Sequence, residues 1–141
     1  MRRQTRNILI GVAAVFAVSF MILRLMDIYQ NPGRVAYILN IAEPPKSMRV
    51  IECESGPITD VVITCAIEID PHEFSLLLDG YHYSRSPAAA TSYTVGIERV
   101  GSEFPVSDEY VVRPSSFKDG GSVSIFADKE KRRAVVDLYI E

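Results

Sequence analysis

The longest uncharged stretch of the chain, residues 8–23, restricts what the N-terminal part can form. These sixteen residues (ILIGVAAVFAVSFMIL) contain no charged side chain. Continued as a helix to residue 26, the stretch is about 28 Å long, close to the hydrocarbon thickness of a bilayer. It is apolar on all faces, whereas a helix packed on a soluble core is usually apolar on one. The sequence therefore predicts one N-terminal transmembrane helix over residues 8–26, in contact with the lipid bilayer.

The charges on either side of this helix predict its orientation. Arg2, Arg3 and Arg6 precede it, and Arg24 lies near its end, where a long side chain can reach the interface. This asymmetry predicts a cytoplasmic tail (residues 1–7), a signal anchor (8–26) and a juxtamembrane linker (27–33). We expect a single-pass protein of the inner (cytoplasmic) membrane, with its N-terminus in the cytoplasm and its C-terminal domain in the periplasm or outside the cell.

A cleaved signal peptide is the alternative interpretation of the same stretch. The basic start and the apolar run fit both, and Ala17-Val18-Ser19 has the small residues of a cleavage site. The following residues, 20–23, remain fully apolar, whereas the sequence after a signal peptide usually becomes polar. We therefore favour a retained anchor.

The remaining residues, 34–141, are enough for one domain with its own core. The whole chain has a net charge of −3, and because residues 1–33 contribute +3, the rest carries −6. This acidic balance argues against nucleic acid as a partner, since binding phosphates needs concentrated positive charge. The chain has no tryptophan, so a Trp-lined sugar platform is unsupported, and no small-molecule ligand is indicated.

The two cysteines, Cys53 and Cys65, are expected to form a disulfide in the exported compartment that this topology implies. Residues 48–54 and 61–69 both alternate as strands do, and a Gly-Pro turn separates them. Each cysteine falls on the apolar side of its strand, so a hairpin would make them neighbours across the strands. The spacing is not Cys-x-x-Cys, so we expect a structural bridge and not a redox centre.

Several further segments have the pattern of strands, and the predicted fold class is mainly β. Asn31-Pro32-Gly33 is expected to end the anchor helix. Asp70-Pro71-His72-Glu73 resembles a helix start, but the alternation after it and Asp79-Gly80 favour a turn over 70–73 and a hairpin at 79–80. Short strands separated by turns that contain Gly and Pro predict a small antiparallel β-sandwich or barrel-like domain with one disulfide. The other expected strands are 34–42, 93–100, 110–113, 122–127 and 134–140.

A search for catalytic chemistry gives only weak candidates. His72, Glu73, Asp79 and His82 lie within eleven positions, but they lack the close pairs typical of zinc sites. The chain has no Gly-x-Ser-x-Gly elbow and no Gly-rich phosphate loop between a strand and a helix. We predict that the protein is not an enzyme and that it needs no metal or cofactor.

The surface then carries the functional hypotheses. Tyr81, His82, Tyr83 and Arg85 form a short aromatic and basic run of the kind that interfaces favour, although Tyr81 and Tyr83 also fit a role in covering the core. We predict a membrane-anchored protein-binding module, an accessory or regulatory subunit of an envelope complex whose partner is a membrane or envelope protein. The alternative is an immunity or inhibitor protein that neutralises a toxin or hydrolase in the periplasm. The mixed charges of residues 129–133 fit a solvated turn, or contact with anionic lipid or an acidic partner.

Overall fold

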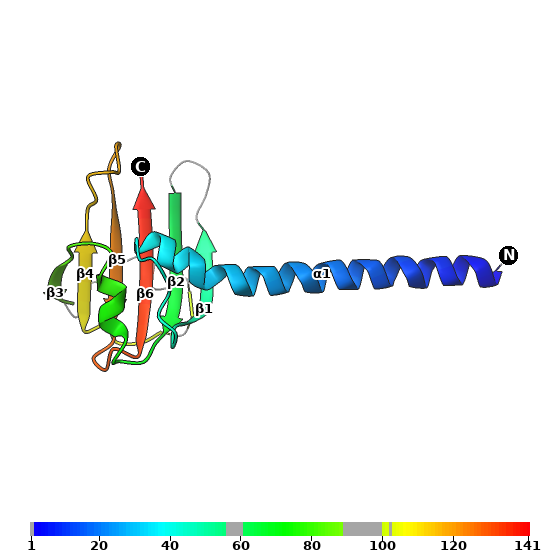
Figure 1. Ribbon diagram of the computed structural model, residues 1–141, viewed down its shortest axis with the longest axis horizontal. Helices are drawn as coiled ribbons and strands as arrows, with labels where there is room; N and C mark the ends of the chain where they lie inside the picture. Colours follow the sequence, from blue (N-terminus) through cyan, green and yellow to red (C-terminus); the bar gives the residue numbers. More distant parts are fainter. Residues whose placement is uncertain (1, 56–60, 89–99, 102) are drawn as a thin grey trace. The chain divides into compact units, whose positions relative to one another are not determined.

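The computed structural model describes the backbone of residues 2–55, 61–88, 100–101 and 103–141, and the side chains of these residues apart from 2–10 and 24–31. Two compact units divide the chain, Met1–Asn31 and Pro32–Glu141. Figure 1 shows the helices and strands along the sequence. The elements within the described residues are α1 (Arg2–Ile38), β1 (Arg49–Ser55), β2 (Val61–Glu68), the 3₁₀ helix η1 (Phe74–Leu78), β3 (Ser84–Pro87), β4 (Asp108–Val112), β5 (Gly121–Ala127) and β6 (Arg133–Ile140).

The first unit, Met1–Asn31, is helical from Arg2 onward, as predicted for residues 8–26. All side chains from 11 to 23 are exposed. Over the described residues, no helix has both the length and the hydropathy that crossing a bilayer requires. The large apolar side chains exposed in this unit are Val12, Val15, Phe16, Val18, Phe20, Met21, Ile22 and Leu23.

The second unit, Pro32–Glu141, is built on one antiparallel sheet of six strands in the order β1-β2-β6-β5-β4-β3 (Figure 1). The β1–β2 and β5–β6 hairpins lie side by side, because β2 pairs with β6 from Val61↔Ile140 to Glu68↔Arg133. After β2 the chain passes through η1 to the opposite edge of the sheet, where β3 pairs with β4. The prediction of a mainly β, antiparallel domain is confirmed.

The predicted disulfide is confirmed and lies within the first hairpin. Cys53 and Cys65 face each other across β1 and β2, and their sulfur atoms are 2.06 Å apart. Cys65 is fully buried in the core, and β1 is the edge strand of the sheet. The bridge therefore holds an edge strand against the rest of the sheet.

Replacing both cysteines with alanine is expected to lower the free energy of unfolding by about 3 kcal/mol, because the bridge restricts the unfolded chain over a sequence separation of 12 residues. Urea unfolding of the oxidised wild type and of the double variant measures this loss. Reductant should destabilise the wild type by a similar amount and leave the variant unchanged. An equal response of both proteins to reductant would contradict the prediction.

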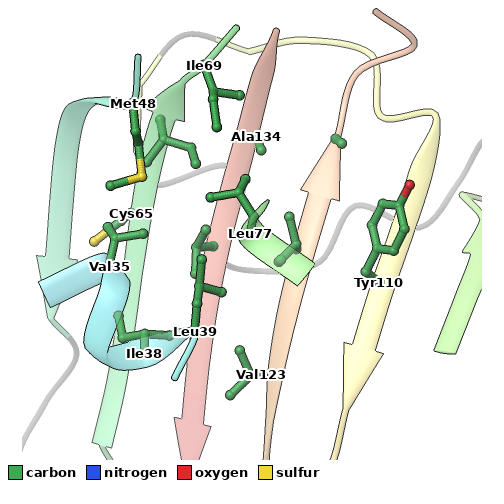
Figure 2. Packing of buried hydrophobic residues seen from close by; sticks show 14 of the residues in the cluster. Val35, Ile38, Leu39, Met48, Cys65, Ile69, Leu77, Tyr110, Val123 and Ala134 are labelled. Atoms are coloured by element: carbon green, nitrogen blue, oxygen red, sulfur yellow. The ribbon is translucent and has the colours of Figure 1, made fainter. Parts of the chain in front are cut away.

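Helical residues cover one face of the sheet. Val35 and Ile38 at the end of α1, the following Leu39, and Leu77 of η1 are almost fully buried against β2, β5 and β6 (Figure 2). The opposite face carries a smaller cluster to which Val100, Phe104 and Val106 contribute. The members of this second cluster are Ala66, Val100, Phe104, Phe126 and Val135, with Val106 packed against them.

The prediction of a β-sandwich or barrel needs correction. The described strands form one open sheet, and no pairing among them joins the two edge strands, β1 and β3. A helix end, a 3₁₀ helix and an irregular segment take the place of a second sheet. A layer of helix on sheet buries apolar surface as well as a second sheet does.

The predicted strand over 34–42 is also wrong, as is the predicted end of the helix at Asn31-Pro32-Gly33. Pro32 lies inside α1, which continues to Ile38. Asn40 then adopts a positive φ of 55°, while its N–H donates to the Tyr37 carbonyl and the N–H of Ile41 donates to the Ala36 carbonyl. This is the Schellman pattern that ends a helix at a left-handed residue.

The hairpin predicted at Asp79-Gly80 does not form. Residues 74–78 are a 3₁₀ helix, and Asp79 has φ −71°, whereas the expected hairpin turn needs a positive φ. The strand predicted over 93–100 lies outside the described residues, except for Val100.

Candidate functional site

An uncharged groove lies beside the end of α1 and has a volume of about 480 Å³. Two tyrosines line it, Tyr37 from the last turn of α1 and Tyr81 from the segment before β3. We call it the tyrosine groove. None of the described residues that line it is charged. They are Ala36, Tyr37, Ile38, Asn40, Ile41, Ala42, Tyr81, Ser116, Phe117, Leu138 and Ile140.

The end of α1 positions the two sides of this groove. Val35, Ile38 and Leu39 follow helical spacing and turn toward the sheet, so Tyr37 faces away from the core. Tyr37 is 82% exposed, the largest exposed fraction among the large apolar and aromatic side chains described. A large aromatic side chain held in this way by a rigid helix turn is a typical anchor for a binding partner.

A close backbone contact joins the helix end to the segment that carries Tyr81. The side-chain amide of Asn40 donates to the carbonyl of Gly80 at 3.0 Å. Gly80 packs so closely against Leu39 and Asn40 that a Cβ atom has no room there. The two tyrosines are therefore placed by one fixed junction, and Tyr37 also contributes to raising the pKa of Tyr81, after burial of Tyr81 itself.

The four predicted partner-binding residues do not lie on one common surface in the structure. Tyr81 is half-buried and lines the tyrosine groove, while His82 is exposed. Tyr83 packs on the core, edge-on to Tyr81 with ring centroids 6.0 Å apart. Arg85 is exposed at the opposite edge of the sheet and pairs with Asp108. Tyr81 thus belongs to the groove, and Arg85 belongs to a separate ion-pair cluster.

The hydroxyl of Tyr83 is buried and has no hydrogen-bond partner among the described residues. Burial raises the pKa of Tyr83 well above its usual range. A neutral, buried phenol of this kind stabilises the core through its ring, and it is not a source of acid–base chemistry near neutral pH.

The ion-pair cluster is centred on Asp108, whose side chain is only 10% exposed. Its carboxylate accepts a hydrogen bond from Nε of Arg85 at 2.9 Å and another from Nζ of Lys131. Lys131 in turn lies over the rings of Phe74 and Tyr110, at 5.3 and 5.1 Å from their centroids. The hydrogen bond from Lys131, followed by that from Arg85, lowers the pKa of Asp108.

Replacing Asp108 with asparagine is expected to cost about 2 kcal/mol of unfolding free energy at pH 7, because two cations lose their charged partner. The contribution of Asp108 is complete above its unfolded pKa of about 4 and is lost as the pH falls through its lower folded pKa. The difference between wild type and variant should therefore shrink in acid. Urea unfolding across this pH range measures it. Glu109→Gln on the same strand is the control, and a difference independent of pH would contradict the prediction.

The candidate metal residues do not converge. The carboxylate of Glu73 accepts hydrogen bonds from the N–H and the hydroxyl of Ser47, at 2.9 and 2.8 Å, and these bonds lower the pKa of Glu73. The neighbouring Asp70 carboxylate accepts from the N–H of His72. Within the part of the chain that the structure describes, no three acidic, histidine or cysteine side chains are grouped to hold a metal ion.

Comparisons of the chain with protein-family models, with curated proteins and with solved structures gave no match. Tyr81 is among the predicted partner-binding residues and Tyr37 is not, because the sequence predicts a strand over 34–42. The available signal was the apolar spacing of Val35, Ile38 and Leu39, which places Tyr37 on the opposite side of a helix.

Proposed function

We propose that the protein is a membrane-anchored binding module, an accessory or regulatory subunit of an envelope complex. Residues 8–26 act as the signal anchor in the cytoplasmic membrane, and the unit Pro32–Glu141 lies on the periplasmic side. The tyrosine groove is its docking surface, and the occupant is an uncharged, apolar segment of an envelope protein. The exposed Tyr37 at the wall of an uncharged groove is the observation that carries this proposal.

The exposed apolar side chains of the first unit support the anchor. From residue 11 to residue 23 they surround a helix without one charge, and water is an unfavourable solvent for such a surface. The arginines before the stretch support a cytoplasmic N-terminus. The disulfide fits an oxidising compartment such as the periplasm.

The chemistry of the groove supports the choice of occupant. Burying a charged side chain against this lining would remove its water without offering an opposite charge, which is costly. Aliphatic or aromatic side chains carry no such desolvation cost, and the hydroxyls of Tyr37 and Tyr81 can form hydrogen bonds with backbone groups of the occupant. An apolar peptide segment therefore fits the groove better than an acidic or basic one.

Photo-crosslinking from position 37 tests this proposal in the native membrane. With Tyr37 replaced by photoreactive benzoyl-phenylalanine in the full-length chain, we expect one protein adduct, identified by mass spectrometry after purification in mild detergent. The same replacement at Leu76, 44% exposed but outside the groove, is the matched control and should give little adduct. Equal adducts from both positions, or lipid adducts alone from position 37, would contradict docking at the groove.

The anchor is tested separately by washing native membranes with alkaline carbonate. The full-length protein should stay in the membrane fraction, and a chain without residues 1–30 should be released. Release of the full-length chain by this wash would refute the anchor, but it would not bear on docking at the tyrosine groove.

An inhibitor or immunity protein remains the second candidate, favoured by the net charge of −6 on residues 34–141. This charge suits a basic toxin or hydrolase, and the complex should weaken markedly with added salt. A secreted toxin or hydrolase in the adduct from position 37 would support this candidate over an accessory subunit.

A further inference from the structure

A second groove, rich in charged side chains, lies at the end of the sheet where β2 ends and β6 begins, and its volume is about 610 Å³. We call it the charged groove. Four cations line it in a domain that is acidic as a whole. The cations are Arg49, Lys129, Arg132 and Arg133, and Glu68 and Glu130 lie among them.

Strand pairing fixes one side of the charged groove. Arg49 pairs in register with Glu68, and Glu68 pairs with Arg133, so the charges alternate in a row across three strands. The guanidinium carbon of Arg133 lies over the ring of Phe104, 5.1 Å from the ring centroid. The sheet therefore fixes the backbone positions from which these three side chains extend.

The turn between β5 and β6 forms the other side. The buried carboxylate of Asp128 accepts hydrogen bonds from the N–H groups of Arg132 and Arg133, at 2.9 and 3.2 Å. It also lies 3.5 Å from Nε of Arg133. Asp128 thus fixes the turn from inside, and Lys129 and Arg132 remain exposed above it.

The ion pairs within the charged groove are easily exchanged. Arg49 pairs with Glu68, and Arg132 lies 3.4 Å from Glu130, but both arginines are about two-thirds exposed. Exposed pairs of this kind contribute little net stability. Lys129 has no ion pair among the described residues. A ligand carboxylate can therefore replace Glu68 or Glu130 as a partner at low cost, and arginine binds carboxylates in a bidentate manner.

We infer that the charged groove binds an acidic peptide segment of a protein partner. Its own acids decide against an anionic membrane surface, because Glu68 and Glu130 stand between the cations and would be repelled by a uniform layer of negative charge. A peptide can place single carboxylates opposite Arg49, Arg132 and Lys129 and avoid the acids between them. This inference does not depend on the tyrosine groove.

Fluorescence anisotropy with the full-length chain in uncharged detergent tests the inference. The probe is a labelled twelve-residue peptide of alternating Glu and Ser, and its Gln–Ser analogue is the uncharged control. The double variant Arg49→Gln/Arg132→Gln should weaken binding about tenfold. The control double variant, Lys46→Gln/Lys118→Gln, removes the same charge from exposed positions outside the charged groove. It should change the affinity for the Glu–Ser peptide less than about twofold.

Each other outcome overturns the inference. Equal weakening by both double variants would mean general charge attraction, and binding of the Gln–Ser peptide would exclude carboxylate recognition. Absence of binding of the Glu–Ser peptide at about 1 mM would also exclude carboxylate recognition. Binding to phosphatidylglycerol vesicles that the peptide does not compete away would assign the groove to lipid. If the double variant unfolds, the single variant Lys129→Gln repeats the test at an exposed position that forms no ion pair with any described residue.

Discussion

Replacing Gly80 with alanine is expected to lower the free energy of unfolding of the second unit by about 4 kcal/mol or more. A Cβ atom at this position would lie 1.9 Å from the carbonyl oxygen of Leu39 and 2.7 Å from the carbonyl atoms of Asn40. These are backbone atoms, so no side-chain rotation can relieve the clash. The chain must separate the end of α1 from the segment after η1, and the hydrogen bond from Asn40 to Gly80 is lost with it. Urea unfolding followed by circular dichroism measures the effect.

Gly33→Ala is the matched control for this prediction. Gly33 is exposed in α1, and a Cβ atom there meets nothing within 4 Å. Alanine is the better helix former, so the control should stabilise the protein by up to about 1 kcal/mol. A loss below about 1 kcal/mol for Gly80→Ala would show that the junction between α1 and η1 adapts, and that the groove is not held rigidly.

Local patterns in the sequence predicted the two hairpins that form one side of the sheet. Alternation placed Cys53 and Cys65 on the same apolar side, and they are direct neighbours in the structure. Alternation along β6 likewise separates Val136 and Leu138, which are in the main core, from Val135, which packs on the opposite face. Such patterns work because the side-chain period of a strand is a local property.

Two predictions, the helix end at residues 31–33 and the hairpin at 79–80, are wrong because tertiary contacts determine the local structure there. Pro32 and Gly33 are strong local signals for the end of a helix, yet burial of Val35 and Ile38 against the sheet stabilises one more turn. At Gly80 the sequence correctly required glycine but for another reason: the residue allows a close approach of two backbones, not a tight hairpin turn. Neither contact has a local signature, because Asn40 and Gly80 lie 40 residues apart and the residues that cover Val35 and Ile38 belong to later strands.

The pairing of β2 with β6 could not be predicted, because the two strands are distant in sequence. The same is true of the two grooves. The tyrosine groove combines Tyr37, Tyr81 and Phe117, and the charged groove combines Arg49 with Arg132. The run Tyr81 to Arg85 looked like one surface because its residues are adjacent in sequence. In the folded chain Tyr81 and Arg85 have different neighbours, since β3 pairs at the far edge of the sheet.

Leu39→Ala is expected to destabilise the second unit by about 3 to 5 kcal/mol. Leu39 is fully buried in the main core and directly follows α1 (Figure 2). Alanine would remove apolar contacts and leave a cavity between the helix end and the sheet, at the place that also positions Tyr37. Leu76→Ala, at a leucine that is 44% exposed, is the control and should cost less than about 1 kcal/mol. Equal losses in urea unfolding for the two variants would mean that the end of α1 is not part of the cooperative core. The tyrosine groove would then lack the rigid wall on which the proposed docking depends.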